Sequence, residues 1–490
     1  MTKLHYLSAV EALRLFRSRE LSPVELLQAV TDRAAEVNGT VNAFTEQLQD
    51  EAMAAARTAE QRYLRGDYDD GALSSTGRAG SAAAQSAAVS ALLGLPVATK
   101  EKHSIAGRSL SQGLLACSDD VAAVDHPVVE RIQAAGGIIH ARTTSPEFSC
   151  ATVTHSPMWG VTRNPWNPEC SPGGSSGGAG AALAAGMTTL ATASDIAGST
   201  RLPASFTGNV GYKAPYGRIP GMPPLSADWY RGDGPMARTV ADTALLANVM
   251  AGPHPLDHTS VGPAAPLPLE YDGVEGMRIA LCIRLGDYPV MPDVEANTRA
   301  VAAALEAAGA VVEEIELPWT SRGISETIFT HFGHILGPAM EAATAGSEDR
   351  LAAYTRRFIA DARAAASRHT LLEGLTAEAR IQTQLAEAMA GFDALVCPAS
   401  AVSALKADED YLDGIDVGGV RLQHYWEAHM TAPFNINNRC PVLAVPSGLA
   451  DVGIPTGVQI VGHPFDDHTV FRIGAAVEQA RPWADMTPPL

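Results

Sequence analysis

The sequence lacks several features that mark particular protein classes. Its six cysteines form no C-x-x-C pair and no cluster, so neither a disulfide framework nor a cysteine-rich metal site is indicated. No stretch of 18 uninterrupted apolar residues occurs, and the N-terminal residues contain no apolar signal-peptide region. We therefore expect reduced thiols, no membrane association and a cytoplasmic location.

Basic and aromatic residues are both scarce. Lys and Arg total 35 against 54 Asp and Glu, which gives a formal net charge of −19 at pH 7. A surface this acidic repels phosphate backbones and argues against nucleic acid as the main ligand. Aromatic residues make up 6% of the chain, whereas alanine and glycine are abundant, which favours helices packed closely on a sheet over a β-sandwich.

The chain of 490 residues is long enough to bury a large core. Segments with a helical pattern alternate with short apolar runs that follow turns, as an α/β sheet with helical cover requires. The predicted strands are residues 95–99, 138–141, 277–282, 311–317 and 394–397. The predicted helices are residues 128–135 and 294–308, with a longer helical stretch over 348–389.

Residues 1–70 are predicted to form a helical N-terminal segment. Within it, Ser22 followed by Glu25 fits an N-cap with an acid three residues later. Residues 71–90 consist mostly of Gly, Ser and Ala and are predicted to be a loose connection. The remainder, residues 71–480 with this connection included, is predicted to be one large domain.

A glycine–serine loop over residues 173–178 is followed by a second glycine-flanked serine, Ser199. Glycine lets the backbone approach a ligand and expose its N–H groups, so Ser175 and Ser199 are candidates for a nucleophile and its helper. A flexible linker is disfavoured because helix-forming residues follow at once. A phosphate-binding loop would need Gly-Lys-Ser/Thr at its end. The loop also matches a G-x-S-x-G nucleophile elbow, but the prolines of residues 164–172 exclude the buried strand that an elbow must follow.

A serine hydroxyl needs a base within hydrogen-bond reach to become an effective nucleophile. None of the 14 histidines lies in a persuasive motif, and His103 and His140, near the relevant segments, are interpreted as structural. Lys100 ends an apolar segment, at the edge where α/β sheets open onto a ligand crevice. Burial there would lower its pKa so that the amine could act as the base. A solvated lysine at the start of a loop is the alternative.

These residues resemble the amidase signature family of serine hydrolases. The family's Gly-Gly-Ser-Ser-Gly-Gly loop stands at residues 173–178, and its Asp-x-Gly-Gly-Ser-x-Arg segment is similar to residues 195–201. Further similar segments are residues 94–100, which end at the family lysine, 145–148, 160–166, 208–213, 440–446 and 455–462. The resemblance therefore spans residues 5–480.

The resemblance implies a Ser–cis-Ser–Lys triad. Ser199 is the expected nucleophile, Ser175 the bridging serine after a non-proline cis peptide bond, and Lys100 the base as a neutral amine. The backbone N–H groups expected to form the oxyanion hole are those of Ile196, Ala197, Gly198 and Ser199. The residues expected to support these groups are Ser176 and the ion pair of Asp195 with Arg201.

Two positions depart from the family pattern. Ala197 stands where the family usually has glycine, which requires a negative φ at that position. Glu101 and Lys102 follow Lys100, where the family usually has Asp and often Asn. Alignment of the preceding Gly-Leu-Pro favours Lys100 as the buried lysine.

The resemblance also implies the fold. We expect an α/β amidase-signature fold, with a large mixed β-sheet covered by helices on both faces, over residues 71–480. Residues 320–420 match no strict motif, and we expect this variable region to shape the substrate pocket. Phe329 and Phe332 are the candidates there for an influence on substrate choice.

The expected function is hydrolysis of carbon–nitrogen bonds in linear carboxamides, other than peptide bonds, through an acyl-enzyme on Ser199. Esters and carbamates are further expected substrates. We expect no metal and no organic cofactor, and a small-molecule substrate as the partner, with a homodimer as one assembly left open. The alternative is the glutaminase (A) subunit of a tRNA-dependent amidotransferase. A catalytically silent binding protein on the same scaffold is disfavoured because Lys100, Ser175 and Ser199 are all present.

Overall fold

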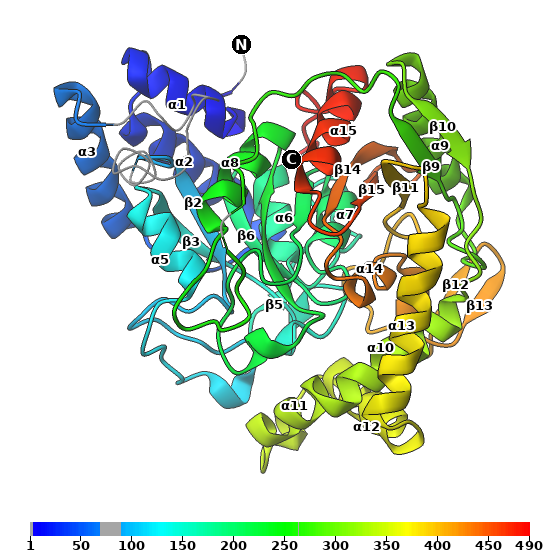
Figure 1. Ribbon diagram of the computed structural model, residues 1–490. Coiled ribbons are helices and arrows are strands. Elements are labelled where there is room, and N and C mark those ends of the chain that lie inside the picture. The colour runs from blue at the N-terminus through cyan, green and yellow to red at the C-terminus, as the bar shows by residue number, and fades with distance from the viewer. Residues whose placement is uncertain (1–2, 69–89, 263) are drawn as a thin grey trace.

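A mixed β-sheet of 11 strands runs through the centre of the molecule (Figure 1). The computed structural model describes residues 3–68, 90–262 and 264–490, so the predicted connection over 71–90 lies almost entirely outside the described residues. The strands, in their order across the sheet, are β1 (Phe44–Gln47), β3 (Ile138–Thr143), β2 (Pro96–Lys100), β6 (Leu190–Asp195), β8 (Gly232–Ala237), β7 (Val210–Lys213), β14 (Val442–Leu449), β15 (Pro455–Gly462), β11 (Ala394–Pro398), β9 (Arg278–Leu281) and β10 (Val311–Glu314).

Helices cover both faces of this sheet, which confirms the predicted fold class. Those associated with the sheet are α1 (Ala9–Ser18), α2 (Pro23–Val41), α3 (Gln49–Arg65), α5 (Pro127–Ala134), α6 (Gly177–Ala184), α7 (Arg201–Thr207), α8 (Val240–Met250), α9 (Pro292–Ala307) and α15 (Asp467–Ala480). Successive strand residues point to opposite faces. Leu190 and Val445 pack in one core with α8 and α15, whereas Ala191 and Ala444 pack in another with α6 and α7.

The strand directions bring the ends of three strands, β2, β6 and β8, to one edge of the sheet. β2 lies parallel to β3 and β6, whereas β8 runs antiparallel to β6 with Asp195 opposite Gly232. The C-terminal ends of β2 and β6 therefore meet the N-terminal end of β8. Lys100 ends β2 and Asp195 ends β6, so this edge positions the candidate site.

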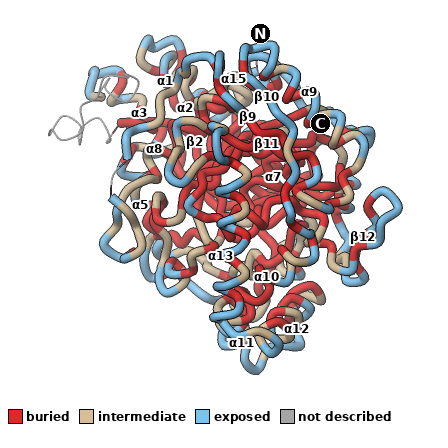
Figure 2. Tube along the Cα trace, turned by 45° about the vertical axis from the view of Figure 1, so that its right-hand side comes forward, coloured by how far each residue is buried: buried red, intermediate tan, exposed pale blue. Residues whose placement is uncertain are grey.

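A second group of helices lies at one end of the molecule, at the lower right of Figure 1. These are α10 (Ser321–His334), α11 (Leu336–Thr344), α12 (Ala353–Arg368) and α13 (Leu371–Ala388), with the short α14 (Pro433–Ile436) nearby. Their buried side chains share a core with the sheet residues Leu395 and Val442. In Figure 2 the buried residues fill the centre, and exposed residues form most of the outer loops. The two small hairpins are β4 (His155–Ser156) with β5 (Gly160–Val161), and β12 (Ile415–Val417) with β13 (Val420–Leu422).

Most predicted elements are confirmed within one to three residues, and two predictions need correction. The N-terminal segment is not wholly helical, because β1 pairs antiparallel with β3 at the edge of the sheet. The stretch over 348–389 is two helices, because Thr370 and Glu373 form a capping box that begins α13 after α12 has ended. The capping box of Ser22 and Glu25 is confirmed at the start of α2. No helix in the described ranges is long and apolar enough to cross a membrane.

Candidate active site

The glycine–serine loop delivers Ser175 and Ser176 to the sheet edge where β2 and β6 end. The loop packs tightly: a Cβ on Gly174 would lie 2.7 Å from the carbonyl oxygens of Ala151 and Val153. The Gly174–Ser175 peptide bond is cis, as the resemblance implied. Helix α6 begins directly after Ser176, which confirms that the loop is not a linker.

Lys100 reaches this loop from the end of β2, and its side chain is completely buried. Its Nζ lies 2.7 Å from Ser175 Oγ, 3.0 Å from Ser176 Oγ and 3.0 Å from Ser194 Oγ. A neutral amine has two N–H groups and one lone pair, which together match three hydroxyl partners. In that state the lone pair is free to accept the proton of Ser175.

The electrostatic surroundings favour the neutral amine. Burial, and then the positive charge of Lys102, lower the pKa of Lys100 well below its usual value. The carboxylates of Asp233 and Asp195 act in the opposite direction but do not reverse the shift. Burial dominates because an ammonium group loses its hydration when it leaves water.

Ser199 lies on the turn that connects β6 to α7, and it lines the same pocket as Ser175. Gly198 holds a φ of 127°, and a Cβ there would overlap the side chain of Thr431. Only glycine adopts this conformation readily. The Ser199 hydroxyl makes no hydrogen bond to Ser175, to a histidine or to any other residue that the structure describes, so its hydrogen bond to Ser175 in the triad stays a prediction.

Asp195 organises the turn around Ser199. Its carboxylate accepts the N–H groups of Gly198 at 2.7 Å and Thr200 at 3.2 Å, and the amide of Asn435 at 3.0 Å. Arg201 forms the predicted ion pair with it at 2.9 Å, with both side chains buried. Burial opposes ionisation of Asp195, but the charge and hydrogen bonds of Arg201 outweigh it and hold the pKa of the carboxyl below its usual range.

This arrangement changes the predicted oxyanion donors. The N–H of Gly198 is already donated to Asp195, so it is not free for a ligand. The N–H groups of Ile196, Ala197 and Ser199 make no hydrogen bond to other residues in the described ranges. The φ of Ala197 is not positive, so alanine is accommodated at this position, where the family usually has glycine.

A narrow pocket, with about 350 Å³ of empty space including its mouth, opens at Ser175 and Ser199. Its lining residues are Lys102, Phe148, Ser149, Cys150, Ser175, Ser194, Asp195, Ile196, Ser199, Arg231, Leu336, Phe358 and Trp426. Leu336 and Phe358 come from the predicted substrate-shaping region. Phe329 and Phe332 do not line the pocket; both rings pack behind it against Phe358 and Trp426.

Comparison with known proteins matches these features. The family model described as Amidase matches residues 68–471, which is most of the chain. The chain belongs to the amidase signature family.

Individual relatives agree over nearly their full length. A glutamyl-tRNA(Gln) amidotransferase subunit of Thermosynechococcus vestitus is 30% identical, with 96% of this chain and 97% of the relative covered. The solved structure of a bacterial aryl acylamidase of the amidase signature family superposes with a TM-score of 0.88 at 26% identity, covering 99% of this chain and 98% of that one. The glutamyl-tRNA(Gln) amidotransferase subunit of Thermotoga maritima gives a TM-score of 0.76 at 26% identity, with 99% and 96% covered. An enzyme that acts on carbon–nitrogen bonds is therefore supported.

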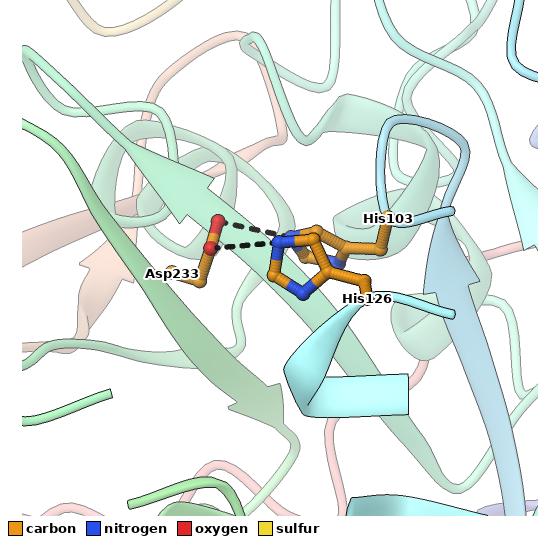
Figure 3. A group of neighbouring side chains, drawn as sticks. All are labelled: His103, His126 and Asp233. Carbon is orange, nitrogen blue, oxygen red and sulfur yellow. Dashed lines mark hydrogen bonds and ion pairs between the residues drawn. The ribbon is translucent and has the colours of Figure 1, made fainter. Parts of the chain in front are cut away.

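Two histidines and an aspartate, His103, His126 and Asp233, form a buried cluster (Figure 3). Asp233 accepts His103 Nε2 at 2.9 Å and lies 3.4 Å from His126 Nε2. These three side chains could supply metal ligands, since their ligand atoms lie within 4.8 Å of one another. However, Nδ1 of His126 accepts the N–H of Val128, so its proton is on Nε2 and points at Asp233. Hydrogen bonding therefore accounts for the cluster.

Burial leaves both histidines neutral. It lowers the pKa of His126 to about 3 and also lowers the pKa of His103. Thr192 explains the orientation of His103, because its Oγ1 accepts the Lys100 backbone N–H and lies 2.8 Å from His103 Nδ1. His103 is thus a structural residue, as predicted, that supports the strand carrying Lys100.

Several site residues were not predicted from the sequence. Ser194 contacts Lys100, and its position directly before Asp195 was the available signal. Arg201 also donates to Thr431 O at 2.9 Å and Gln459 Oε1 at 2.6 Å. No local pattern connects these residues, because more than 200 positions separate them from Arg201. The sequence assigned no role to Glu101. In the structure its carboxylate accepts the backbone N–H of Ser111 at 2.8 Å.

The variant Asp195→Asn keeps the shape of the side chain but removes the charge that pairs with Arg201. Because the guanidinium stays buried without a counter-charge, we expect a loss of about 3–5 kcal/mol in stability, measured as a lower thermal unfolding midpoint at pH 7. The double variant Asp195→Asn/Arg201→Met should recover part of that loss. Glu313→Gln, in an exposed pair with Arg278, is the control and should cost less than about 1 kcal/mol. An unchanged midpoint for Asp195→Asn would contradict this account.

Proposed function

We propose that this protein is an amidase that hydrolyses the carbon–nitrogen bond of small carboxamides through an acyl-enzyme. The observation that carries the proposal is the contact of a fully buried lysine amine with the Ser175 hydroxyl at 2.7 Å, in a pocket that Ser199 also lines. A fully buried lysine whose hydrogen-bond partners in the described ranges are all hydroxyl groups is suited to act as a base rather than as an ion-pair partner.

The proposed relay transfers protons in sequence. Lys100 takes the proton of Ser175, Ser175 takes that of Ser199, and the Ser199 oxygen attacks the substrate carbonyl. The same path in reverse protonates the nitrogen of the leaving amine, and the carbon–nitrogen bond breaks. Water then attacks the acyl ester by the same route, which releases the carboxylic acid and restores Ser199.

The negative charge on the carbonyl oxygen needs donors that are fixed before the reaction. We assign this role to the backbone N–H groups of Ile196, Ala197 and Ser199. Asp195 supports the assignment, because its bonds to the N–H groups of Gly198 and Thr200 fix the turn that presents the three donors. Donors placed in this way contribute about 3–4 kcal/mol each in serine hydrolases.

The pocket supports a small substrate with an apolar part. Phe148, Leu336, Phe358 and Trp426 line it beside the serines. Linear amides are the proposed substrates, and esters and carbamates share the same acylation step. The similar solved structure described as an aryl acylamidase agrees with a substrate that has an aromatic part.

The second candidate is the glutaminase subunit of a tRNA-dependent amidotransferase. Relatives named as amidotransferase subunits, among them the Thermosynechococcus vestitus protein at 30% identity, favour it. That role would require partner subunits. A silent binding protein is disfavoured because Ser175 and Ser199 line one pocket and Lys100, which forms no ion pair with a described carboxylate, contacts Ser175 there.

Labelling with a fluorophosphonate tests the nucleophile. We expect one covalent adduct on Ser199, located by peptide mass mapping, because this hydroxyl is the one activated by the relay. Ser199→Ala should lose the label and reduce kcat by about 10⁴- to 10⁶-fold. The control Ser367→Ala, on the exposed surface of α12, should be labelled like the wild type. An adduct on Ser175 would overturn the assignment of roles.

The pH dependence of kcat/KM tests the base. Because the neutral amine is the active form and its pKa is well below the usual value, activity should rise with pH as Lys100 loses its proton and reach a plateau at mildly alkaline pH. Lys100→Arg stays charged over this range and should lose activity at every pH. A profile with its maximum near pH 5 would exclude a lysine base.

Activity of the isolated chain separates the two candidate functions. We expect the purified chain, without other subunits, to hydrolyse 4-nitroacetanilide and benzamide, because all proposed catalytic groups lie within it. Ser199→Ala purified in the same way is the control for contaminating activity. Hydrolysis confined to glutamine, or seen only after other subunits are added, would favour the amidotransferase role.

A further inference from the structure

Two cationic side chains flank the strand that leads to Ser199. Lys102 follows β2 on one side of β6, and Arg231 precedes β8 on the other side. The pairing of Asp195 with Gly232 places Arg231 at the level of the turn that begins at Ile196. Both cations line the pocket together with Ser175 and Ser199.

The side chain of Arg231 has no partner in the described part of the chain. Its guanidinium forms no ion pair and no hydrogen bond there, and its Nε is buried without an acceptor. A buried guanidinium N–H without an acceptor is costly, since the group has lost water and gained nothing in exchange. Its five N–H donors suit a planar, bidentate acceptor such as a carboxylate.

The carboxylates nearest in the chain are already engaged. Asp233 lies 3.6 Å from Lys102 but also accepts His103, and it faces His126 (Figure 3). Asp228 accepts His331 Nε2 at 2.7 Å through Oδ1, while its Oδ2 is buried and makes no hydrogen bond to a described residue, Arg231 included. Asp233 thus pairs with Lys102, whereas the Arg231 guanidinium has no ion pair within the described ranges and faces the pocket with its positive charge.

The ionisation of these groups is consistent with that balance. Burial lowers the pKa of Lys102 to about 8, so the side chain is mostly protonated at neutral pH. Burial opposes ionisation of Asp233, but Lys102 and His103 hold the pKa of this carboxyl well below its usual value.

We infer that Lys102 and Arg231 form an anion subsite, and that the preferred amide substrate carries a carboxylate group. The inference rests on the proposed function and specifies its substrate class. Arg231 would bind the carboxylate with two N–H groups, while Lys102 adds a point charge from the opposite side. The apolar side chains of Phe358 and Trp426 line the rest of the pocket.

Among the described residues that line the pocket, no carboxylate is free to bind an ammonium group. Asp195 is the one carboxylate among its lining residues, and Arg201 already pairs with it at 2.9 Å. Succinamate and glutaramate, which carry a carboxylate but no α-ammonium, should therefore be better substrates than glutamine. This order would not be expected of a glutamine-specific site.

Matched substrate pairs test the subsite. Succinyl-4-nitroanilide and 4-methylpentanoyl-4-nitroanilide have the same shape and differ by the carboxylate on the acyl side. The pair 4-acetamidobenzoate and 4-isopropylacetanilide makes the same comparison on the amine side. We expect the carboxylate member to be preferred by about 10- to 100-fold in kcat/KM in at least one pair.

Variants then locate the preference. Arg231→Gln should raise KM for the preferred anionic substrate by about 10- to 100-fold. The KM for the matched neutral substrate should stay within about threefold of the wild-type value. Arg231→Lys should restore part of the affinity. Arg368→Gln removes an exposed arginine of α12 and serves as the charge-matched control. It should leave the KM for both substrates unchanged.

The outcomes separate this inference from the proposed function. Equal kcat/KM values for both members of both pairs would overturn the subsite while leaving the amidase proposal intact. An equal loss on the two members in Arg231→Gln, with a shifted pH profile, would show that Arg231 only tunes Lys100. No hydrolysis of any amide, with no labelling of Ser199, would instead refute the proposed function.

Discussion

The site depends on one constraint, the enclosure of an uncharged lysine amine among hydroxyl groups. Lys100 is removed completely from water, and its three polar neighbours are serine oxygens between 2.7 and 3.0 Å away. An ammonium group there would have no ion-pair partner among the described residues, so the packing of the glycine–serine loop on β2 and β6 selects the basic form. The tightness of that packing, visible at Gly174, is therefore part of the proposed chemistry.

A second polar network keeps the reactive turn in place. Asp195 accepts two N–H groups of the turn, and Arg201 extends the network to Thr431 and Gln459 from distant parts of the chain. The turn that carries Ser199 is thus attached, through Arg201, to β15 and to the turn before α14 rather than to its own neighbours alone. A buried ion pair with all its hydrogen bonds made fixes geometry, even where its net contribution to stability is small.

The charges around the lysine act on both the base and the ligand. Lys102 and Arg231 each disfavour a further positive charge, and both lower the pKa of Lys100. The same two cations face the pocket, where an anion would complement them. The chain as a whole carries a formal charge of −19, so this positive region is local and comes from the three strands that meet at one sheet edge. Net charge argued against phosphate backbones as ligands, but it could not reveal a single cationic subsite.

The sequence by itself determined the family motifs, the α/β alternation, the capping boxes and the identity of the lysine and serines that meet at the site. These features depend on residues close together in the chain, where spacing and local conformational preference carry the information. Only the tertiary structure decided that β1 joins the sheet and that the Gly198 N–H donates its hydrogen bond to Asp195. It also decided that Phe358 lines the pocket while Phe329 and Phe332 pack behind it. The strand pairing and the pocket lining depend on contacts between segments far apart in the chain, whereas the Gly198–Asp195 hydrogen bond depends on the exact conformation of a turn, which residue types do not reveal. Hydrophobic periodicity indicates that a ring is buried without indicating which wall it faces.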